Sequence, residues 1–471
     1  MREKKIVVVG MGYVGIPAAA LFADVAGFNV VGIQRRSERS GWKIDWLNNG
    51  KNPIGGDEPG LSELIEKVVK QGTFRVTDDF SECNDADAIL IDVQTPTDEY
   101  GIPHYESLKE VSKHVGRQMR RDVLVVIEST IAPGTTENVV KPILEKESKL
   151  ELELELGAGK DFALAFSYER VMVGRLLHNI INYPRIIGGV DEESTKRAME
   201  LYNTIVKAEL YPTDVLTAEV AKVAENAYRD VNIAFANEMA LMCESLGVDV
   251  FKVRELVNTL PNDPSNPSAN PIRNMHFPGA GVGGHCLPKD SWLLKYGVDT
   301  YGTFKVEPDI IVKSRELNAW MPTHMADLLE EGLRDAGRKL ESAKIAILGV
   351  AFLENSDDTR NTPSRPLYER LVEKGAKPVL HDPYVRDFDI PFTKDLNEAI
   401  NGTDAVVIVT KHNEYLNMDL GSMKKTMRTP VLVDGRGVYR KDECENLGFI
   451  YKGVGRPHNT FSFFTKKENL C

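Results

Sequence analysis

The chain has 471 residues, a length that predicts about two to four domains and excludes a single small binding module. Its 58 Lys and Arg against 70 Asp and Glu give a net charge of −12, which argues against nucleic-acid binding, because phosphate binding depends on clustered basic charge. Five cysteines without CxxC spacing fit neither a disulfide framework nor a zinc site. We therefore expect a reducing, cytoplasmic compartment and no metal.

The N-terminal stretch carries two opposing signals. A basic start precedes the long apolar run 6–33, as in a signal peptide or a membrane-spanning helix. Gly10, Gly12 and Gly15 interrupt this run, Asp24 charges it, and its pattern changes from β-type to helical and back. These features predict a strand, a helix and a second strand, and no membrane segment.

Short β-branched runs alternate with helical patterns through the first part of the chain, which predicts a parallel sheet covered by helices. Residues 151–159 alternate Glu and Leu, which indicates a surface insertion. Pro212, Thr213 and Asp214 predict a break in the chain and a helix cap. The expected strands are 6–9, 29–33, 88–93, 123–127, 162–166 and 185–187, with a helix at 106–119.

A long uninterrupted helix is predicted in the middle of the chain. Residues 215–246 contain no Pro or Gly, and Gly247 stands where a helix C-cap would. Such a helix is about 45 Å long, too long for one small domain, so it connects domains or builds a subunit interface. The stretch 261–271 predicts a loop, and the glycine-rich stretch 279–290 follows it.

The alternation of strands and helices then starts again. The fold class is therefore α/β, with two Rossmann-like domains joined by a helical middle domain. We expect an N-terminal dinucleotide-binding domain at 1–212, a middle domain at 213–320 and a C-terminal domain at 321–471. The expected elements of the last domain are strands 344–348, 378–381, 405–410 and 430–433, and helices from Ser364 and after Thr393.

The sequence Gly10-Met11-Gly12-Tyr13-Val14-Gly15 closes the first strand and opens the first helix. In this context Gly10 permits a tight turn, Gly12 permits a pyrophosphate to approach the backbone, and Gly15 permits close packing of helix on strand. The motif predicts dinucleotide binding, with Tyr13 and Val14 at the same loop. The alternative is a glycine-rich turn that binds nothing.

The acid expected at the end of the second strand of an NAD site is missing. Gln34, Arg35 and Arg36 stand there instead. A neutral residue beside two guanidinium groups tolerates a ribose 2′-phosphate, so NADP is an alternative to NAD. The other interpretation is that the arginines stack on the adenine or face water.

Cys286 lies in the stretch Gly281-Val-Gly-Gly-His-Cys-Leu-Pro-Lys-Asp290. Flexible glycines, His285 and Lys289 beside it, and the carboxylate of Asp290 four residues on suit a nucleophilic thiol. The alternative is an inert core cysteine. His285 itself is expected to organise the loop or contact a ligand rather than to act as the base.

Lys222 and Asn226 are four residues apart on the long helix and share a face. A lysine beside an amide on a stretch of Ala and Val suits the stabilisation of an oxyanion. The alternative is an ordinary solvent-facing lysine, with Glu219 and Glu225 as solvated neighbours.

In this order the motifs resemble the UDP-glucose/GDP-mannose dehydrogenase family, and within it the UDP-N-acetylhexosamine 6-dehydrogenase branch. The resemblance covers almost the whole chain. Its marks are the GxGxxG loop, Thr95 and Pro96, Ser129 and Thr130 with residues 133–136, Glu169 to Val171, the helix bearing Lys222 and Asn226, and the stretches 283–290, 349–364 and 434–437.

The resemblance implies oxidation of the C6 alcohol of a UDP-sugar to a carboxylate by two hydride transfers to NAD, in the synthesis of polysaccharide or glycan precursors. It implies that Cys286 forms a thiohemiacetal and then a thioester, and that Lys222 and Asn226 hold the oxyanion. Proton transfer and hydrolysis fall to Asp290, Glu169 and a water placed by Thr130. Implied cofactor contacts also include Thr95, Thr130, Gln34 and Arg35, and implied substrate contacts are Glu169, Arg170, Lys222, Asn226, Gly283, Arg360 and Arg436.

Three residues depart from the family pattern. Gln34 replaces the usual acid, Tyr168 replaces the proline before Glu169, and Leu353 replaces a lysine. Nucleotide binding by the last domain then depends more on Arg360 and Arg436, for which a domain-closing salt bridge is the alternative.

Other functions remain open at this point. They are UDP-glucose oxidation, a simple hydroxyacid dehydrogenase that needs no cysteine, and a nucleotide-sugar sensor without activity. Among acetamido sugars, the residues leave N-acetylmannosamine, N-acetylglucosamine and N-acetylgalactosamine open. We also expect a homodimer or higher homo-oligomer that binds neither nucleic acid nor membrane.

Overall fold

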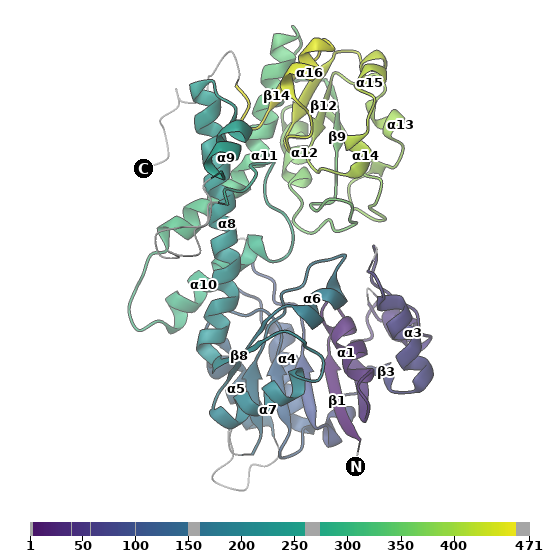
Figure 1. Cartoon of the computed structure of the whole chain (residues 1–471), viewed down its shortest axis with the longest axis vertical. Helices are drawn as coiled ribbons and strands as arrows, with labels where there is room; N and C mark the ends of the chain where they lie inside the picture. The colour runs from purple at the N-terminus through teal and green to yellow at the C-terminus, as the bar shows by residue number, and fades with distance from the viewer. Residues whose placement is uncertain are drawn as a thin grey trace. The chain divides into compact units, whose positions relative to one another are not determined.

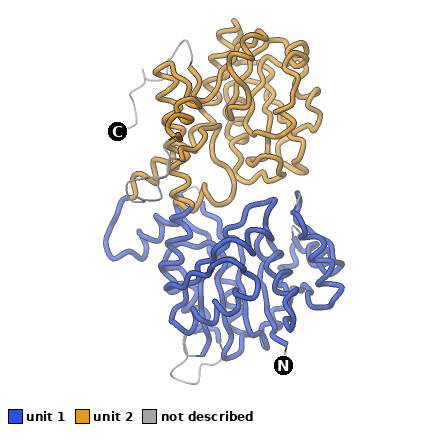
Figure 2. The backbone as a smooth tube through the Cα atoms, viewed as in Figure 1, with its two compact units in different colours: residues 1–225, 292–307 blue, residues 226–291, 308–471 orange. Residues whose placement is uncertain are grey.

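The computed structural model describes residues 3–38, 40–56, 58–98, 100–148, 161–259 and 274–457. The predicted insertion at 151–159 and the predicted loop at 261–271 lie outside these residues. Figure 2 shows two compact units. Unit 1 is Met1–Glu225 with Trp292–Glu307, and unit 2 is Asn226–Ser291 with Pro308–Cys471. The division into three domains stays a prediction.

Unit 1 is built on an eight-stranded sheet with the order β3-β2-β1-β4-β5-β6-β7-β8 (Figure 1). Neighbouring strands are parallel, as predicted, except that β7 is antiparallel to β6. Between these two strands the only described helix, α6, has seven residues and is about 10 Å long, too short to return the chain across the sheet. The strands are β1 (Lys4–Val9), β2 (Phe28–Ile33), β3 (Phe74–Thr77), β4 (Ala88–Ile91), β5 (Leu124–Ile127), β6 (Ala163–Phe166), β7 (Arg185–Gly189) and β8 (Leu210–Asp214).

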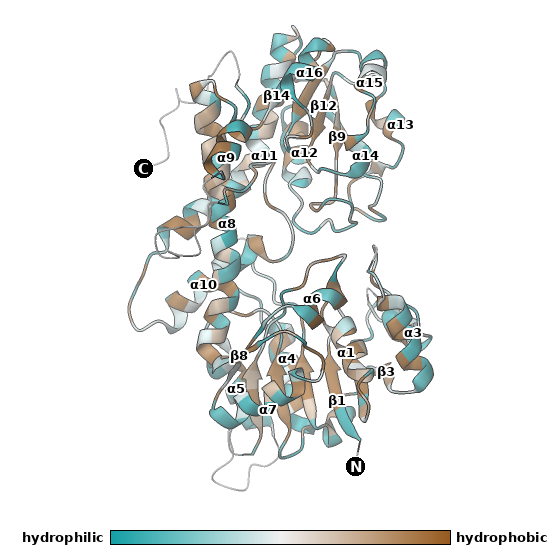
Figure 3. Cartoon of the chain, in the orientation of Figure 1, coloured by the Kyte–Doolittle hydropathy of each residue, from teal (hydrophilic) through white to brown (hydrophobic). Residues whose placement is uncertain are grey.

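Helices cover both faces of this sheet, which explains why its strands are apolar runs (Figure 3). Along β1, Ile6 and Val8 face one core, while Val7 and Val9 face the other. The first core includes α1, α3, α6 and α7, and the second includes α4, α5 and the start of α8. The helices are α1 (Gly15–Ala23), α2 (Trp42–Asn48), α3 (Leu61–Gln71), η1 (Phe80–Asp85), α4 (Glu106–Gln118), η2 (Thr136–Val140), α5 (Lys141–Glu147), α6 (Leu176–Asn182) and α7 (Glu192–Tyr202).

The helix α8 (Val215–Leu246) has the bounds that the sequence predicts. The Asp214 carboxylate accepts hydrogen bonds from the backbone N–H of Thr217 (2.8 Å) and from its hydroxyl (2.6 Å), so the predicted cap is present. The predicted break before it is wrong, because β8 pairs with β7 and leads directly into the helix. An edge strand tolerates the proline at 212. Both units contain part of α8, since the boundary between them follows Glu225.

Unit 2 contains a six-stranded parallel sheet with the order β11-β10-β9-β12-β13-β14. Its centre is again buried on both faces, with Ile345 and Ile347 in one core and Ala346 and Leu348 in the other. The strands are β9 (Lys344–Leu348), β10 (Lys377–His381), β11 (Phe392–Thr393), β12 (Ala405–Ile408), β13 (Val431–Asp434) and β14 (Ile450–Gly453). The helices beyond α8 are α9 (Val250–Val257), α10 (Leu287–Tyr301), α11 (Asp309–Asp335), α12 (Ser364–Glu373), α13 (Leu396–Ile400), α14 (Asn413–Leu416), α15 (Leu420–Thr426) and α16 (Lys441–Asn446).

No helix in the described part of the chain has the length and apolarity needed to span a bilayer.

Candidate active site

The glycine-rich loop between β1 and α1 is shaped by contacts that exclude side chains. Gly10 has φ +109°, and a β-carbon there would lie 1.8 Å from the Asp92 carbonyl oxygen. A β-carbon on Gly15 would lie 1.9 Å from the Gly10 carbonyl oxygen, so both residues must be glycine. A β-carbon on Gly12 would approach only the Asp92 carboxylate, at 4.0 Å. Gly12 is therefore open on the side where a side chain would lie, which is the space that the motif requires for a pyrophosphate to approach the backbone.

Gln34 follows β2 and points back to this loop. Its Oε1 accepts a hydrogen bond from the Met11 N–H (3.1 Å), and its Nε2 donates to the Ser40 hydroxyl (3.0 Å). Lys43 of α2, which the sequence reasoning missed, donates from Nζ to the Met11 carbonyl oxygen at 3.0 Å. Burial lowers the pKa of this amine. Lys43 thus places its amine beside the loop that would receive the dinucleotide.

Arg35 and Arg36 are exposed beyond the end of β2. Arg36 Nε forms an ion pair with Asp78 Oδ2 at 3.1 Å, and both side chains face solvent. Exposed pairs of this kind contribute little free energy, so Asp78 holds Arg36 only weakly.

Asp92, also missed, lies under the glycine-rich loop at the end of β4. Its Oδ2 accepts a hydrogen bond from the Gly15 N–H at 2.8 Å. Loss of hydration and the nearby charge of Glu128 raise the pKa of this carboxyl to about 7, against the effect of the Gly15 N–H. The carboxyl is therefore neutral below about pH 7 and negative above it.

This titration predicts a pH dependence of NAD binding. As pH rises through about 7, ionised Asp92 repels the pyrophosphate, and we expect NAD affinity to fall by about tenfold, or about 1.4 kcal/mol. Asp92→Asn should bind NAD almost equally at pH 6 and 8.5 in isothermal titration calorimetry. Asp24→Asn, at the other end of α1, is the control and should behave as the unaltered protein. A wild-type pH profile in Asp92→Asn would contradict the assignment.

The loops that follow β4 and β5 are tied together. Thr95 is buried, and its hydroxyl donates to the Thr130 carbonyl oxygen at 2.5 Å. The Ser129 hydroxyl accepts from the Val93 N–H at 2.8 Å. The predicted residues Thr95 and Thr130 therefore lie side by side in unit 1.

Glu169 follows β6 and enters a buried cluster that the sequence does not reveal. Its carboxylate forms an ion pair with Arg185, which pairs through its other terminal nitrogen with Glu128 at 2.6 Å. The Arg185 guanidinium lies 3.7 Å from the centre of the Tyr202 ring, and the Tyr202 hydroxyl donates to Glu128 at 2.8 Å. The side chain of Glu169 is thus held in one orientation.

Lys222 is buried on α8 in unit 1. Its Nζ donates to the Glu169 carbonyl oxygen at 3.4 Å and lies 5.1 Å from the centre of the Tyr168 ring. The Tyr168 hydroxyl donates to Glu225 at 3.2 Å, and burial raises the pKa of this phenol to about 12. Tyr168, which departs from the family pattern, therefore supplies an aromatic face for the ammonium group. A solvent-facing Lys222 is excluded.

Two neighbours of Lys222 differ from each other in environment. Glu219 is fully buried, and its carboxylate accepts from the backbone N–H groups of Gly134 (2.6 Å) and Thr136 (2.8 Å). Burial raises its pKa to about 7. The alternative of a solvated Glu219 is therefore excluded, because its carboxylate holds the loop before η2. Glu225 is exposed and pairs with Arg170 at 3.0 Å.

In unit 2, Cys286 immediately precedes α10. Among the cysteines that the structure describes, Cys83, Cys243 and Cys444 are buried, and Cys286 alone is partly accessible. Burial, followed by the charges of Lys289 and Arg360, lowers the pKa of His285 to about 4. The imidazole is therefore neutral at pH 7, so His285 contributes no positive charge to the Cys286 loop.

Asp290 lies in the first turn of α10 and is fully buried. Its two carboxylate oxygens accept from different side chains, Oδ2 from Asn226 Nδ2 (2.6 Å) and Oδ1 from Lys289 Nζ (2.8 Å). Its backbone N–H donates to the Cys286 carbonyl oxygen at 2.9 Å. Unit 2 thus brings Asn226, Cys286 and Asp290 together, while Thr130, Glu169 and Lys222 belong to unit 1.

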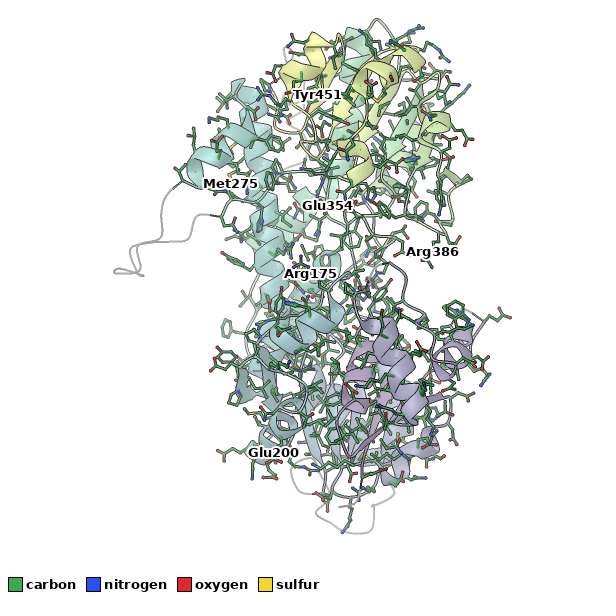
Figure 4. All side chains as sticks on the ribbon, turned by 45° about the vertical axis from the view of Figure 1, so that its right-hand side comes forward. Arg175, Glu200, Met275, Glu354, Arg386 and Tyr451 are labelled. Atoms are coloured by element: carbon green, nitrogen blue, oxygen red, sulfur yellow. The ribbon has the colours of Figure 1, made fainter. Side chains whose placement is uncertain are left out.

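The predicted nucleotide contacts of unit 2 are engaged with carboxylates. Arg360 donates to Asp358 through Nε (2.9 Å and 3.1 Å) and Nη2 (2.5 Å). Arg436 Nη2 donates to Glu354 at 2.7 Å, next to Leu353 in the position of the missing lysine; Glu354 is labelled in Figure 4. Both arginines therefore pair within unit 2, and their contact with a nucleotide stays a prediction.

No group of three or more His, Cys, Asp and Glu side chains suited to a metal ion occurs among the described residues.

Models of one family match three successive segments of the chain. They are described as the NAD binding domain at residues 4–206, the central domain at 216–320 and the UDP binding domain at 346–441 of the UDP-glucose/GDP-mannose dehydrogenase family. The glycine-rich loop lies in the first segment, Cys286 in the second and Arg360 in the third.

The chain is also similar to individual proteins over nearly its whole length. It is 38% identical over 455 residues to UDP-N-acetyl-D-mannosamine dehydrogenase of Pyrococcus horikoshii, which covers 96% of this chain and 99% of that protein. The crystal structure of NDP-N-acetyl-D-galactosaminuronic acid dehydrogenase from Methanosarcina mazei Go1 shares 44% identity at a TM-score of 0.85, covering 97% of this chain and 96% of that one.

A nicotinamide cofactor fits the residues that the first segment presents. The open space at Gly12 and the cation of Lys43 beside the loop suit the pyrophosphate of a dinucleotide. With the three matched segments, this site shows that the chain belongs to the UDP-glucose/GDP-mannose dehydrogenase family and is an NAD-binding oxidoreductase.

Proposed function

We propose that the protein oxidises the C6 alcohol of a UDP-N-acetylhexosamine to the uronate, in the synthesis of polysaccharide or glycan precursors. The observation that carries this proposal is the partly accessible Cys286 thiol four residues before the buried Asp290. A thiol that traps the aldehyde lets one site complete a four-electron oxidation without releasing it. The match to a UDP binding domain supports a UDP-sugar, and sets aside a simple hydroxyacid dehydrogenase.

The proposed reaction has two oxidation steps and one hydrolysis step. When bound, NAD accepts a hydride in each of the two oxidation steps. Cys286 adds to the aldehyde to form a thiohemiacetal, which becomes a thioester as the second hydride leaves. Water then cleaves the thioester, releases the carboxylate and restores the thiol. Four electrons leave the sugar, and the acid keeps one oxygen atom from water.

Proton movement falls to the carboxylates. Asp290 is fixed by Asn226 and Lys289, and its backbone N–H is bound to the Cys286 carbonyl oxygen at 2.9 Å, so it suits proton transfer near the thiol. Glu169 is fixed by Arg185 and would serve hydrolysis with a water placed by Thr130. Lys222, whose ammonium is buried, supplies positive charge for the oxyanion.

The names of similar proteins reduce the number of sugars that we propose as substrates. The names of the similar proteins refer to N-acetylmannosamine and N-acetylgalactosaminuronic acid, both acetamido sugars. A screen of UDP-N-acetylmannosamine, UDP-N-acetylglucosamine, UDP-N-acetylgalactosamine and UDP-glucose, read by absorbance of reduced cofactor, tests it. We expect an acetamido sugar to be oxidised with two NAD reduced per molecule. One NAD per sugar, or UDP-glucose as the best substrate, would contradict the proposal.

A homodimer through α8 is part of the proposed function. Tyr228, Phe235, Met242 and Leu246 are exposed at intervals of seven, seven and four residues on this helix. A second copy that covers this stripe would remove it from water. The free thiols of the described cysteines are consistent with the cytoplasmic location that we propose.

Use of NADP is predicted from the residues after β2. Arg36 can exchange Asp78 for a 2′-phosphate, so we expect appreciable turnover with NADP. Replacing Arg35 and Arg36 by alanine should shift the ratio of kcat/KM values towards NAD by about tenfold, the effect of one charge-assisted contact. Asp78→Asn, which frees Arg36, should shift the ratio the other way. If NADP is inert with the unaltered protein and with Asp78→Asn, the arginines have no cofactor role.

A further inference from the structure

The loop that carries Cys286 is held by a second loop of unit 2, residues 352–361, which we name the clamp. We propose that Asn361 in the clamp is a positioning residue that sets the place of the Cys286 thiol through Gly284. This inference rests on the proposed role of Cys286 and concerns a residue whose side chain bonds to Gly284 rather than to Cys286 itself.

Two hydrogen bonds join the clamp to Gly284. The Gly284 N–H donates to the Arg360 carbonyl oxygen at 2.8 Å. The Asn361 side chain returns a bond, from Nδ2 to the Gly284 carbonyl oxygen at 2.9 Å. Both backbone polar groups of a residue two positions before Cys286 are therefore fixed by neighbouring residues of one segment.

Phe352 restricts the same loop by contact. A β-carbon on Gly283 would lie 2.4 Å from Phe352 Cβ, and one on Gly284 would lie 2.9 Å from the Phe352 ring. Gly284 also has φ +89°, a conformation that favours glycine. The Phe352 N–H donates to the Asp358 carbonyl oxygen at 3.0 Å, which closes the clamp on itself. The loop therefore lies against the clamp with no room for a side chain at either glycine.

Asn361 itself is exposed and has φ +48°, in the left-handed region that asparagine tolerates better than most residues. An exposed side-chain amide contributes little to global stability. Its hydrogen bond to Gly284 can therefore be removed without unfolding the protein. The bond instead fixes the backbone of Gly284 and His285, the two residues that precede Cys286.

The clamp also contains Arg360, a proposed contact for the nucleotide. One segment would then bind the distal end of the substrate and place the nucleophile. Loss of the Asn361 amide should misplace the thiol while leaving the Arg360 side chain present. We therefore expect kcat to fall and the KM values to change little, because a displacement of about 1 Å at a reacting atom can lower the rate by about 100-fold.

The test compares Asn361→Gly with Asn355→Gly. Glycine accepts the left-handed backbone at both positions, so each change removes only the side-chain amide. Asn355 is the matched control, because it lies in the clamp with φ +55° but its Oδ1 accepts from the Asn413 N–H at 2.9 Å, away from Gly284. Asn361→Asp is a second variant that keeps the size of the side chain and lacks the N–H donor.

Two readouts are measured on the full chain with NAD present. The first is the rate of Cys286 alkylation by iodoacetamide, followed on the Cys286 peptide by mass spectrometry. The second is steady-state oxidation of the UDP-sugar. Both Asn361 variants should change the alkylation rate by about threefold or more and lower kcat by about 10- to 100-fold, with KM values within about threefold. Asn355→Gly should match the unaltered protein in both readouts, and all variants should melt within a few degrees of it.

Three results would overturn the inference. In the first, folded Asn361 variants show normal alkylation of Cys286 and normal kcat. In the second, the Asn361 variants raise KM and leave kcat unchanged. In the third, Asn355→Gly lowers kcat as much as the Asn361 variants do. The proposed function can fail separately. If the unaltered protein oxidises no UDP-sugar, the function is wrong, while the alkylation comparison still decides whether Asn361 places the thiol.

Discussion

We expect that replacing Cys286 by serine will abolish net oxidation to the acid and leave substrate and NAD binding intact. Serine fills almost the same space, but its hydroxyl is a far weaker nucleophile than a thiol and does not yield a thioester. Removal of a catalytic nucleophile lowers turnover by several orders of magnitude, so we expect a loss of about 1,000-fold or more in acid formation. Chromatographic measurement of the uronate product checks this, and calorimetric titration with the UDP-sugar checks binding.

Cys444→Ala is the control for this substitution, since Cys444 is also in unit 2 but buried, where its pKa is raised to about 12. It should keep normal turnover once folding is verified. Acid formation by Cys286→Ser at a rate near that of the unaltered protein would refute the covalent mechanism. An aldehyde that accumulates in the serine variant would support it, because the first hydride transfer needs no thiol.

Much of the fold was predictable from local patterns. The bounds of α8 and β9 and the start of α12 agree with the sequence, because uninterrupted helical or β-branched runs were bordered by Gly, Pro or a capping residue. The strand β8 was missed, because Pro212 and Asp214 are typical of turns and an edge strand tolerates them. The antiparallel direction of β7 depends on how the chain returns after β6, which no residue pattern specifies.

The candidate site was predictable where chemistry is encoded by spacing. The GxGxxG loop, the i, i+4 pair on α8 and the Cys286 stretch are local motifs. Asp92, Lys43 and Arg185 were not found, because their partners Gly15, Met11 and Glu128 lie 77, 32 and 57 residues away. The structural role of Glu219 was not found for the same reason, since only the fold brings two backbone N–H groups to its carboxylate. A buried partner far along the chain leaves no local signature.

Alanine at Lys222 or Asn226 should each lower turnover by about 100- to 1,000-fold, the usual effect of removing one preorganised oxyanion donor. The side chains of Lys222 and Asn226 have different surroundings in the structure. Lys222 presents a buried ammonium over the Tyr168 ring, and Asn226 gives one amide hydrogen to Asp290, which leaves its second for a ligand. Asn232→Ala on the same helix is the control, because the Asn232 amide donates only to the Tyr228 carbonyl oxygen among its described contacts.

Whether the two groups act on one oxyanion is decided by the double variant. If they do, Lys222→Ala combined with Asn226→Ala costs less than the product of the two single losses, since residues that act as a unit are non-additive. If Asn226 acts mainly by orienting Asp290, its loss should instead be non-additive with Asp290→Asn and multiply with that of Lys222. Thermal melting establishes that each variant is folded. Folded single variants that each lose less than about tenfold, or 1.4 kcal/mol, would show that neither residue stabilises the oxyanion, because preorganised donors in a buried site are worth more than this.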